Sequence, residues 1–348
     1  MNEGPVPSPK RDGPSLVVTL LFATVLLVTV GLLLLSIPAG VYAFFFTQLS
    51  TSGYSWMTAG HPVLWIGPGA LILPFQVSLG AMFLAVTVIY VLMLAYSAQQ
   101  GTNPFRALRD AIQSGVASLF KSPFFVTVIS IGFLVFTASV IDAVVSGTAP
   151  AADPLLYLSS LSEAPLFEEL GFRMMIIGLA VALIILATRH RGVLKALWRP
   201  SSAIGQKPAG RTMMFILAGL LGFSAVIFGA THVLYGWSSG KFFEATYGGL
   251  VLGYVYIKYG FHVSVLTHWG VNYFGSAFAF FGQGVYGIPW DSATKEFIFQ
   301  QLVDIDLIYV FGLLSFLIVA YIGIRSLVLS RKSLPRIPEV QPTMGIPA

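Results

Sequence analysis

The stretch Phe167-Glu168-Glu169-Leu170-Gly171-Phe172-Arg173 places three ionisable side chains near the start of an apolar run that extends to residue 188. An ionisable side chain at the centre of a bilayer costs about 2.5 to 3.5 kcal/mol on insertion scales, so such residues usually face the interior of a helix bundle and have a partner. The stretch therefore predicts a membrane bundle with a polar interior, and it locates the candidate chemistry in that interior.

The composition of the whole chain agrees with a membrane protein. Of its 348 residues, 56% are hydrophobic and only 9% are charged, and the mean hydropathy is +0.83, which is far more apolar than a soluble domain. The absence of cysteine excludes disulfides and thiolate chemistry. The net charge of +5 comes mostly from loops and tails, so it reflects membrane topology and indicates no nucleic-acid partner.

Eight apolar runs approach or exceed the length of about 20 residues that a transmembrane helix needs. They lie at residues 16–37, 70–97, 124–146, 163–188, 212–236, 243–258, 262–282 and 304–328. The predicted fold class is therefore all-α: a polytopic integral membrane protein with about eight transmembrane helices around an intramembrane polar cavity. We expect one domain over residues 16–328, with a catalytic core at about 160–280, between disordered tails 1–15 and 329–348.

Lysine and arginine residues predict the orientation, because cytoplasmic loops carry an excess of them. They precede the first predicted span and follow the second, fourth and eighth, whereas the loops 38–69 and 147–162 contain none. This pattern predicts that both termini are cytoplasmic. We expect the protein to reside in the plasma membrane.

The first cluster divides into an ion pair and a separate acid. Residues four apart share a helix face, so Glu169 stacks on Arg173, and we interpret the two as a structural ion pair. Glu168 points to a different side of the helix and has no evident local partner, which makes it the candidate general base. Three other acids, Asp153, Glu163 and Glu244, are interpreted as loop or helix-end charges.

Two later spans each contribute a pair of residues at a spacing of four. Phe228 and His232 share a face of the fifth span, and His268 and Asn272 share a face of the seventh. A Glu, a His and a pair of donors suffice to activate a water and to stabilise an oxyanion. Taken singly, each histidine is equally well explained as a hydrogen-bonded bundle residue. Their joint occurrence favours catalysis.

The motifs Glu168-Glu169-x-x-x-Arg173, Phe228-x-x-x-His232 and His268-x-x-x-Asn272 resemble, in this order, the pattern of the CAAX protease and bacteriocin-processing (Abi) family. That family includes the type II CAAX prenyl endopeptidases, or Ras-converting enzymes, and the resemblance covers about residues 160–280. It implies an intramembrane endopeptidase acting on a peptide or prenylated peptide, with no cofactor. By the same resemblance Glu168 and His232 activate the water, while His268 and Asn272 form the oxyanion site.

Two other functions fit the same residues. A zinc ion on Glu168, His232 and His268 is a chemically acceptable three-ligand catalytic site, although the chain has no HExxH motif. Alternatively, the buried acid and histidines serve a proton-coupled transporter, or hold together a catalytically silent immunity or scaffold protein. The oligomeric state stays open at this level.

The predicted spans place Glu168 and His268 at different depths in the membrane. Taken literally, Glu168 lies near the outer membrane face and His268 near the inner face, with a vertical gap on the order of 10 Å. The two side chains cannot act together across such a gap. We therefore expect the fourth helix to begin nearer Pro154 and to be long and tilted, the other possibility being a re-entrant span.

Overall fold

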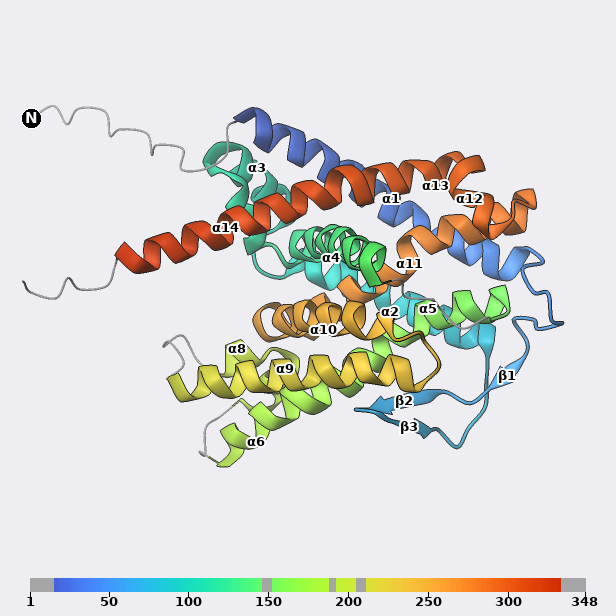
Figure 1. The fold of residues 1–348 in the computed structure, drawn as a ribbon, viewed down its shortest axis with the longest axis horizontal. Helices are drawn as coiled ribbons and strands as arrows, with labels where there is room; N and C mark the ends of the chain where they lie inside the picture. The colour runs from blue at the N-terminus through green and yellow to red at the C-terminus, as the bar shows by residue number, and fades with distance from the viewer. Residues whose placement is uncertain (1–15, 146–151, 188–191, 205–210, 333–348) are drawn as a thin grey trace, which may run out of the picture.

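The structure is a computed structural model that describes residues 16–145, 152–187, 192–204 and 211–332 (Figure 1). The predicted tail 1–15 lies outside the described residues, as does 333–348, but residues 329–332 of the second predicted tail continue the last helix. The elements in chain order are α1 Leu16–Phe46, β1 Ala59–Gly60, β2 Val63–Ile66, β3 Gly69–Ile72, β4 Val77–Ser78, α2 Leu79–Gln99, α3 Pro104–Ser114, η1 Val116–Lys121, α4 Pro123–Val145, α5 Pro154–Glu168, η2 Glu169–Gly178, α6 Leu179–Ala187, α7 Val193–Trp198, α8 Pro200–Ala203, α9 Arg211–Leu234, α10 Gly240–Tyr259, α11 Phe261–Tyr286, η3 Trp290–Ser292, α12 Ala293–Glu296, α13 Ile298–Val303, η4 Asp304–Phe311 and α14 Gly312–Lys332.

The protein is a polytopic all-α membrane protein, as the sequence predicts. Among the described residues, six helices are long and apolar enough to cross a membrane: Leu16–Phe46, Leu79–Gln99, Pro123–Val145, Pro154–Ala187, Thr212–Leu234 and Ile298–Val328. The predicted count of eight is not confirmed, because α10 and α11 are absent from this set. These two helices carry several polar residues, among them Lys241, Glu244, His268 and Asn272, which lower their hydropathy.

The fourth predicted span is a single long helical stretch of 34 residues, from Pro154 to Ala187. It begins where the side chain of Asp153 accepts a hydrogen bond from the backbone amide of Leu155, and this N-cap satisfies one of the amides left free at a helix start. The expectation that this helix starts near Pro154 is thus confirmed. Its central part, η2, is π-helical, and such segments are frequent at functional sites.

The predicted span 70–97 is wrong in its first part, because the helix begins at Leu79. Residues before it form two antiparallel strand pairs, β1 with β4 and β2 with β3. The pair β2–β3 is closed by Gly67 and Pro68, and Gly67 has a positive φ of 58°. A glycine at the first position of a two-residue turn favours a hairpin. We call the segment from β2 to β3, residues 63–72, the hairpin.

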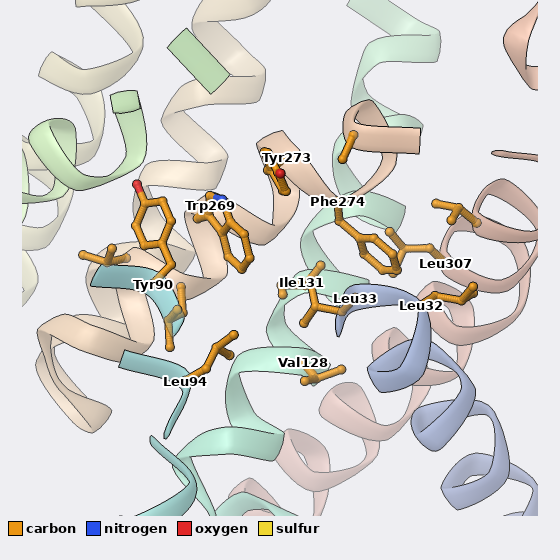
Figure 2. Close-up of a cluster of buried hydrophobic side chains, with 14 of the residues drawn as sticks. Leu32, Leu33, Tyr90, Leu94, Val128, Ile131, Trp269, Tyr273, Phe274 and Leu307 are labelled. Carbon is orange, nitrogen blue, oxygen red and sulfur yellow. The ribbon is translucent and has the colours of Figure 1, made fainter. Parts of the chain in front are cut away.

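The hydrophobic core lies where α1, α2, α4 and α11 meet (Figure 2). Its centre is a stack of three rings: Tyr90 lies 4.9 Å from Trp269, and Trp269 lies 5.1 Å from Tyr273, between ring centroids. Close packing here depends on small residues, since a Cβ added at Gly40 would lie 1.9 Å from the Tyr273 hydroxyl. The core fixes α11, and therefore the polar residues on α11, relative to the rest of the bundle.

Candidate functional site

A cavity of about 570 Å³ opens between α4, α5, α9, α10 and α11. Its wall includes Glu168 from α5, His232 from α9, and His268 and Asn272 from α11. The structure therefore brings together on one cavity the four residues that the sequence proposes for catalysis. Most of the remaining wall is apolar or aromatic, as is usual for a ligand site.

Glu169 points away from this cavity and is fully buried. Its carboxylate lies 3.3 Å from the Nε of Arg173, and the Arg173 side chain is also fully buried. The Glu169 carboxylate also accepts hydrogen bonds from the Ser264 hydroxyl and from Nδ1 of His268, the latter at 2.9 Å. A buried carboxylate needs this number of partners to offset its desolvation. Glu169 therefore connects its own helix to α11 at two points.

Glu168 has a partner that the sequence does not indicate. Its carboxylate lies 3.6 Å from Nε2 of His268. This partner comes from α11 and not from the helix of Glu168 itself. The difficulty of depth is resolved in the way expected from the sequence. The gap disappears because the helix starts at Pro154, which places Glu168 roughly 20 Å along it at 1.5 Å per residue.

The His268 ring consequently lies between two neighbouring carboxylates, Glu169 at Nδ1 and Glu168 at Nε2. A carboxylate only accepts hydrogen bonds when it is ionised, so the contact with the buried Glu169 places a proton on Nδ1. In the neutral ring, Nε2 is then an acceptor facing Glu168, and in the protonated ring it is a donor. This ring orientation is set by Glu169.

Phe228 is the aromatic centre of the site. The guanidinium of Arg173 lies 4.2 Å from the centroid of its ring, a favourable cation–π distance. The same ring contacts His232 edge-on at 4.7 Å and His268 edge-on at 5.8 Å. Within the described residues the guanidinium nitrogens make no hydrogen bond. The ion pair with Glu169 and the face of Phe228 are therefore what holds Arg173.

His232 is oriented by its own helix. Its Nδ1 lies 2.9 Å from the backbone carbonyl oxygen of Phe228, one turn earlier. Because a carbonyl oxygen only accepts, Nδ1 carries a proton, and in the neutral ring Nε2 is left as an acceptor. Close approach of α9 and α10 at this level depends on Gly229, where an added Cβ would lie 2.1 Å from the Thr246 hydroxyl.

Asn272 lies one helical turn after His268 on the cavity wall. Among the described residues its side-chain amide makes no hydrogen bond to the protein. An amide carries two N–H donors, so it can donate to an oxygen placed in the cavity.

The hairpin contributes to the cavity wall, which the sequence does not reveal. Trp65 and Val63 line the cavity, and so does His61, which precedes the hairpin. The Trp65 ring packs edge-on against Tyr235 at 4.6 Å, just after α9. A Cβ added at Gly171 would lie 2.0 Å from the Trp65 carbonyl oxygen. The glycine of the first motif is therefore where the hairpin meets η2.

The sequence also misplaces two acids. Glu163 lies inside α5 and Glu244 lies in the first part of α10, and both line the cavity. Glu244 forms an ion pair of 2.7 Å with Lys241, which lines the cavity as well. The spacing of Ser160, Glu163 and Phe167 ahead of Glu168 is the signal that could have placed Glu163 on this face. Asp153 is a helix-end charge, as expected.

In the described part of the chain, no three His, Asp or Glu side chains are grouped so that they could hold a metal ion. Glu168, His232 and His268 line one cavity, yet their side chains do not form such a group in this arrangement.

Comparison with known proteins gives one family. The model of the type II CAAX prenyl endopeptidase Rce1-like family matches residues 150–274. No curated protein and no solved structure matched the chain. The matched segment contains every site residue that the sequence predicts, from Glu168 to Asn272. The resemblance inferred from the three motifs is thus confirmed: residues 150–274 match the Rce1-like type II CAAX prenyl endopeptidases.

Proposed function

We propose that this protein is an intramembrane endopeptidase in which Glu168 and His232 activate a water molecule, while His268 and Asn272 bind the oxyanion that forms. The observation that carries the proposal is the meeting of these four side chains, from three helices, on one cavity in the segment that matches the prenyl endopeptidase family. Hydrolysis inside a bilayer requires such a cavity, because water and carboxylates are otherwise excluded from hydrocarbon.

The proposed reaction begins with a water held between Glu168 and His232. Glu168 takes a proton from this water as its oxygen bonds to the peptide carbonyl carbon. The carbonyl oxygen becomes an oxyanion, which accepts hydrogen bonds from the Asn272 amide and from Nε2 of a protonated His268. Glu168 then returns the proton to the leaving nitrogen, and the carbon–nitrogen bond breaks to give a carboxylic acid and an amine. The mechanism needs no metal ion.

Glu169, Arg173 and Phe228 have a positioning role in this proposal. Glu169 fixes the ring of His268, and Arg173 balances the charge of Glu169 while it rests on Phe228. None of the three needs to contact the substrate. Their loss should therefore disturb the folding and the geometry of the site more than the chemistry itself.

The proposed substrate is a peptide, prenylated or not, that reaches the cavity within the lipid bilayer. The apolar wall around the polar residues supports a partly apolar ligand. The lysine and arginine pattern supports cytoplasmic termini, and we propose the plasma membrane as the site of action.

The test is cleavage of a fluorogenic peptide, in prenylated and unprenylated forms, by the purified protein in proteoliposomes. We expect wild-type protein to cleave at least one form and the Glu168→Gln and His232→Ala proteins to lose this activity, by about 100-fold or more, since Glu168 transfers the proton and His232 holds the water. The matched control is Glu296→Gln, because Glu296 is an exposed acid outside the cavity. Cleavage by the Glu168→Gln protein at the wild-type rate would contradict the mechanism.

Two further arms address the alternatives. Preincubation with a zinc chelator should leave the activity unchanged, and loss of activity that added zinc restores would favour the zinc mechanism. Proton-coupled uptake by proteoliposomes that show no peptide cleavage would favour a transporter instead.

A further inference from the structure

Glu163 lies on the wall of the candidate active-site cavity without a role in the proposed mechanism. It belongs to α5, five residues before Glu168, and Ser160, Ala164 and Phe167 of the same helix also line the cavity. The hydroxyl of Ser159 donates a hydrogen bond to its carboxylate. The side chain is therefore held on the cavity face of the helix that carries Glu168.

Among the acids on the cavity wall, Glu163 differs from Glu168 and Glu244 because it has no cationic or histidine partner in the described part of the chain. Lys241 is already paired with Glu244 at 2.7 Å, and Glu168 faces His268 at 3.6 Å. In the described part of the chain, no Lys, Arg or His lies within ion-pair distance of Glu163. Its side-chain partner is the neutral Ser159. A carboxylate on a largely apolar wall is stabilised when a ligand brings the opposite charge.

The position of Glu163 relative to Glu168 gives the place of that charge in the substrate. Five residues of helix correspond to about 7.5 Å along the axis. An extended peptide bound along α5 would advance about 3.3 Å per residue, so this separation corresponds to roughly two residues of substrate. Side chains two apart in an extended chain also point to the same side.

We propose that Glu163 forms a subsite for a cationic side chain, lysine or arginine, two residues from the bond that is cleaved. The inference rests on the proposed function, because it uses Glu168 as the place of the scissile bond. It assigns to the cavity a preference for a basic residue over a neutral one of the same length, and discrimination against an acidic residue at the same position.

The experiment measures peptide binding by the Glu168→Gln protein, in which the proposed mechanism leaves the peptide intact. Two pairs of fluorescent peptides are compared, each with lysine or norleucine two residues from the scissile bond, on its amino-terminal side in one pair and on its carboxyl-terminal side in the other. We expect the lysine peptide of one pair to bind roughly 10-fold more tightly than its norleucine counterpart, the lower end of the couplings measured between close charge pairs at interfaces.

The preference should depend on Glu163 alone. Adding Glu163→Gln to the Glu168→Gln protein should abolish it, adding Glu163→Asp should retain part of it, and adding Glu296→Gln on the surface should leave it unchanged. Thermal denaturation verifies that each protein is folded, and the Glu163→Asp protein keeps the test valid if the glutamine variant does not fold. Equal binding of lysine and norleucine in both pairs, or a preference that survives Glu163→Gln, would overturn the inference.

The inference and the proposed function can fail separately. Cleavage of the norleucine peptides by the wild-type protein, which retains Glu168, tests the endopeptidase alone. Those peptides carry no charge for Glu163 to bind. Cleavage without any lysine preference removes the subsite and keeps the endopeptidase. A lysine preference that requires Glu163, in a protein that cleaves none of the peptides, keeps Glu163 as a binding site for a cationic side chain and removes both the endopeptidase and the position of this site relative to a cleaved bond.

Discussion

Nδ1 of His268 lies 2.9 Å from the carboxylate of Glu169, and this buried contact fixes the ring so that its other nitrogen faces Glu168. Two adjacent glutamates of one helix thus act on the same histidine from its two sides. One is fully buried and paired with Arg173, whereas the other lines the cavity. Replacement by glutamine should therefore mainly lower stability at Glu169 and mainly lower activity at Glu168.

Glu169→Gln should destabilise the protein, while Glu168→Gln should leave its stability nearly unchanged. Glu169→Gln leaves the fully buried Arg173 without its counter-charge, and breaking a buried pair costs about 3–5 kcal/mol. The two proteins are compared by thermal denaturation in detergent and by peptide cleavage. Equal melting temperatures would contradict the assignment of Glu169 as the buried partner of Arg173.

Removing both members of the pair should cost less than removing one. In the Glu169→Gln/Arg173→Met protein no buried charge is left uncompensated, so part of the stability should return. A double-mutant cycle on the free energy of unfolding measures the coupling, which we expect to exceed 1 kcal/mol for groups in contact. Additive single effects would show that the 3.3 Å contact does not contribute.

Phe228→Leu should lower activity in a protein that still folds. The substitution removes the ring that Arg173 lies over and that His232 and His268 contact, a loss of about 1–2 kcal/mol. We expect a lower kcat, because the rings of His232 and His268 both lose the aromatic contact that helps to orient them. The control is Phe215→Leu, an exposed ring on the same helix, which should change neither stability nor cleavage.

Gly171→Ala should impair the docking of the hairpin. The added Cβ would lie 2.0 Å from the backbone carbonyl oxygen of Trp65, and a backbone atom cannot move aside cheaply. We expect a loss of stability of about 1–3 kcal/mol from overpacking and weaker substrate binding. Gly222→Ala is the matched control, because nothing lies within 4 Å of its added Cβ. In that control, alanine should stabilise α9 slightly.

Asp153 should make the stability depend on pH on the acid side. Burial alone would raise the pKa of this carboxyl, but hydrogen bonds from the amides of Thr51, Ser52 and Leu155 outweigh burial and hold the pKa below its ordinary value of 3.8. A depressed pKa in the folded state means that the contribution is complete well above pH 3.8 and is lost as the pH falls through the folded value.

Asp153→Asn tests that contribution. It should lower stability by about 1 kcal/mol at neutral pH, because the negative charge at the helix start and its charge-assisted hydrogen bonds are lost although asparagine still caps the helix, and the difference from wild type should shrink below pH 3.8 as Asp153 itself becomes protonated. Thermal denaturation at both pH values measures it. A difference that is equal at both would mean that the charge of Asp153 is not involved. Asp110→Asn, at an acid next to the exposed Arg106 and Arg109, is the control.

The sequence predicts the helical class and the residues that meet at the site, because both depend on local patterns. Long apolar runs predict helices, and a spacing of four places His268 and Asn272 on one face wherever α11 lies. The sequence does not reveal the hairpin, because Leu71 and Ile72 are as apolar as a membrane span and the turn at Gly67 and Pro68 decides their conformation.

The contact of His268 with both glutamates could not be predicted in the same way. It depends on how α11 packs against the long helix that begins at Pro154, and on the π-helical segment that starts at Glu169. Neither the packing of the two helices nor the change from α-helix to π-helix can be inferred from the spacing of the motif residues. The position of Glu163 on the wall of the cavity is different, because its helical spacing from Ser160 and Phe167 does indicate it.

Because the hairpin lines the cavity, the wall of the cavity is built from two separate parts of the chain. Val63 and Trp65 precede the matched segment 150–274, yet they complete the chamber in which the motif residues lie. The reacting groups and one of the surfaces that a ligand must fit thus belong to separate stretches of sequence. Changes in the hairpin can reshape what the chamber admits while the helices that bear Glu168 and His268 stay as they are.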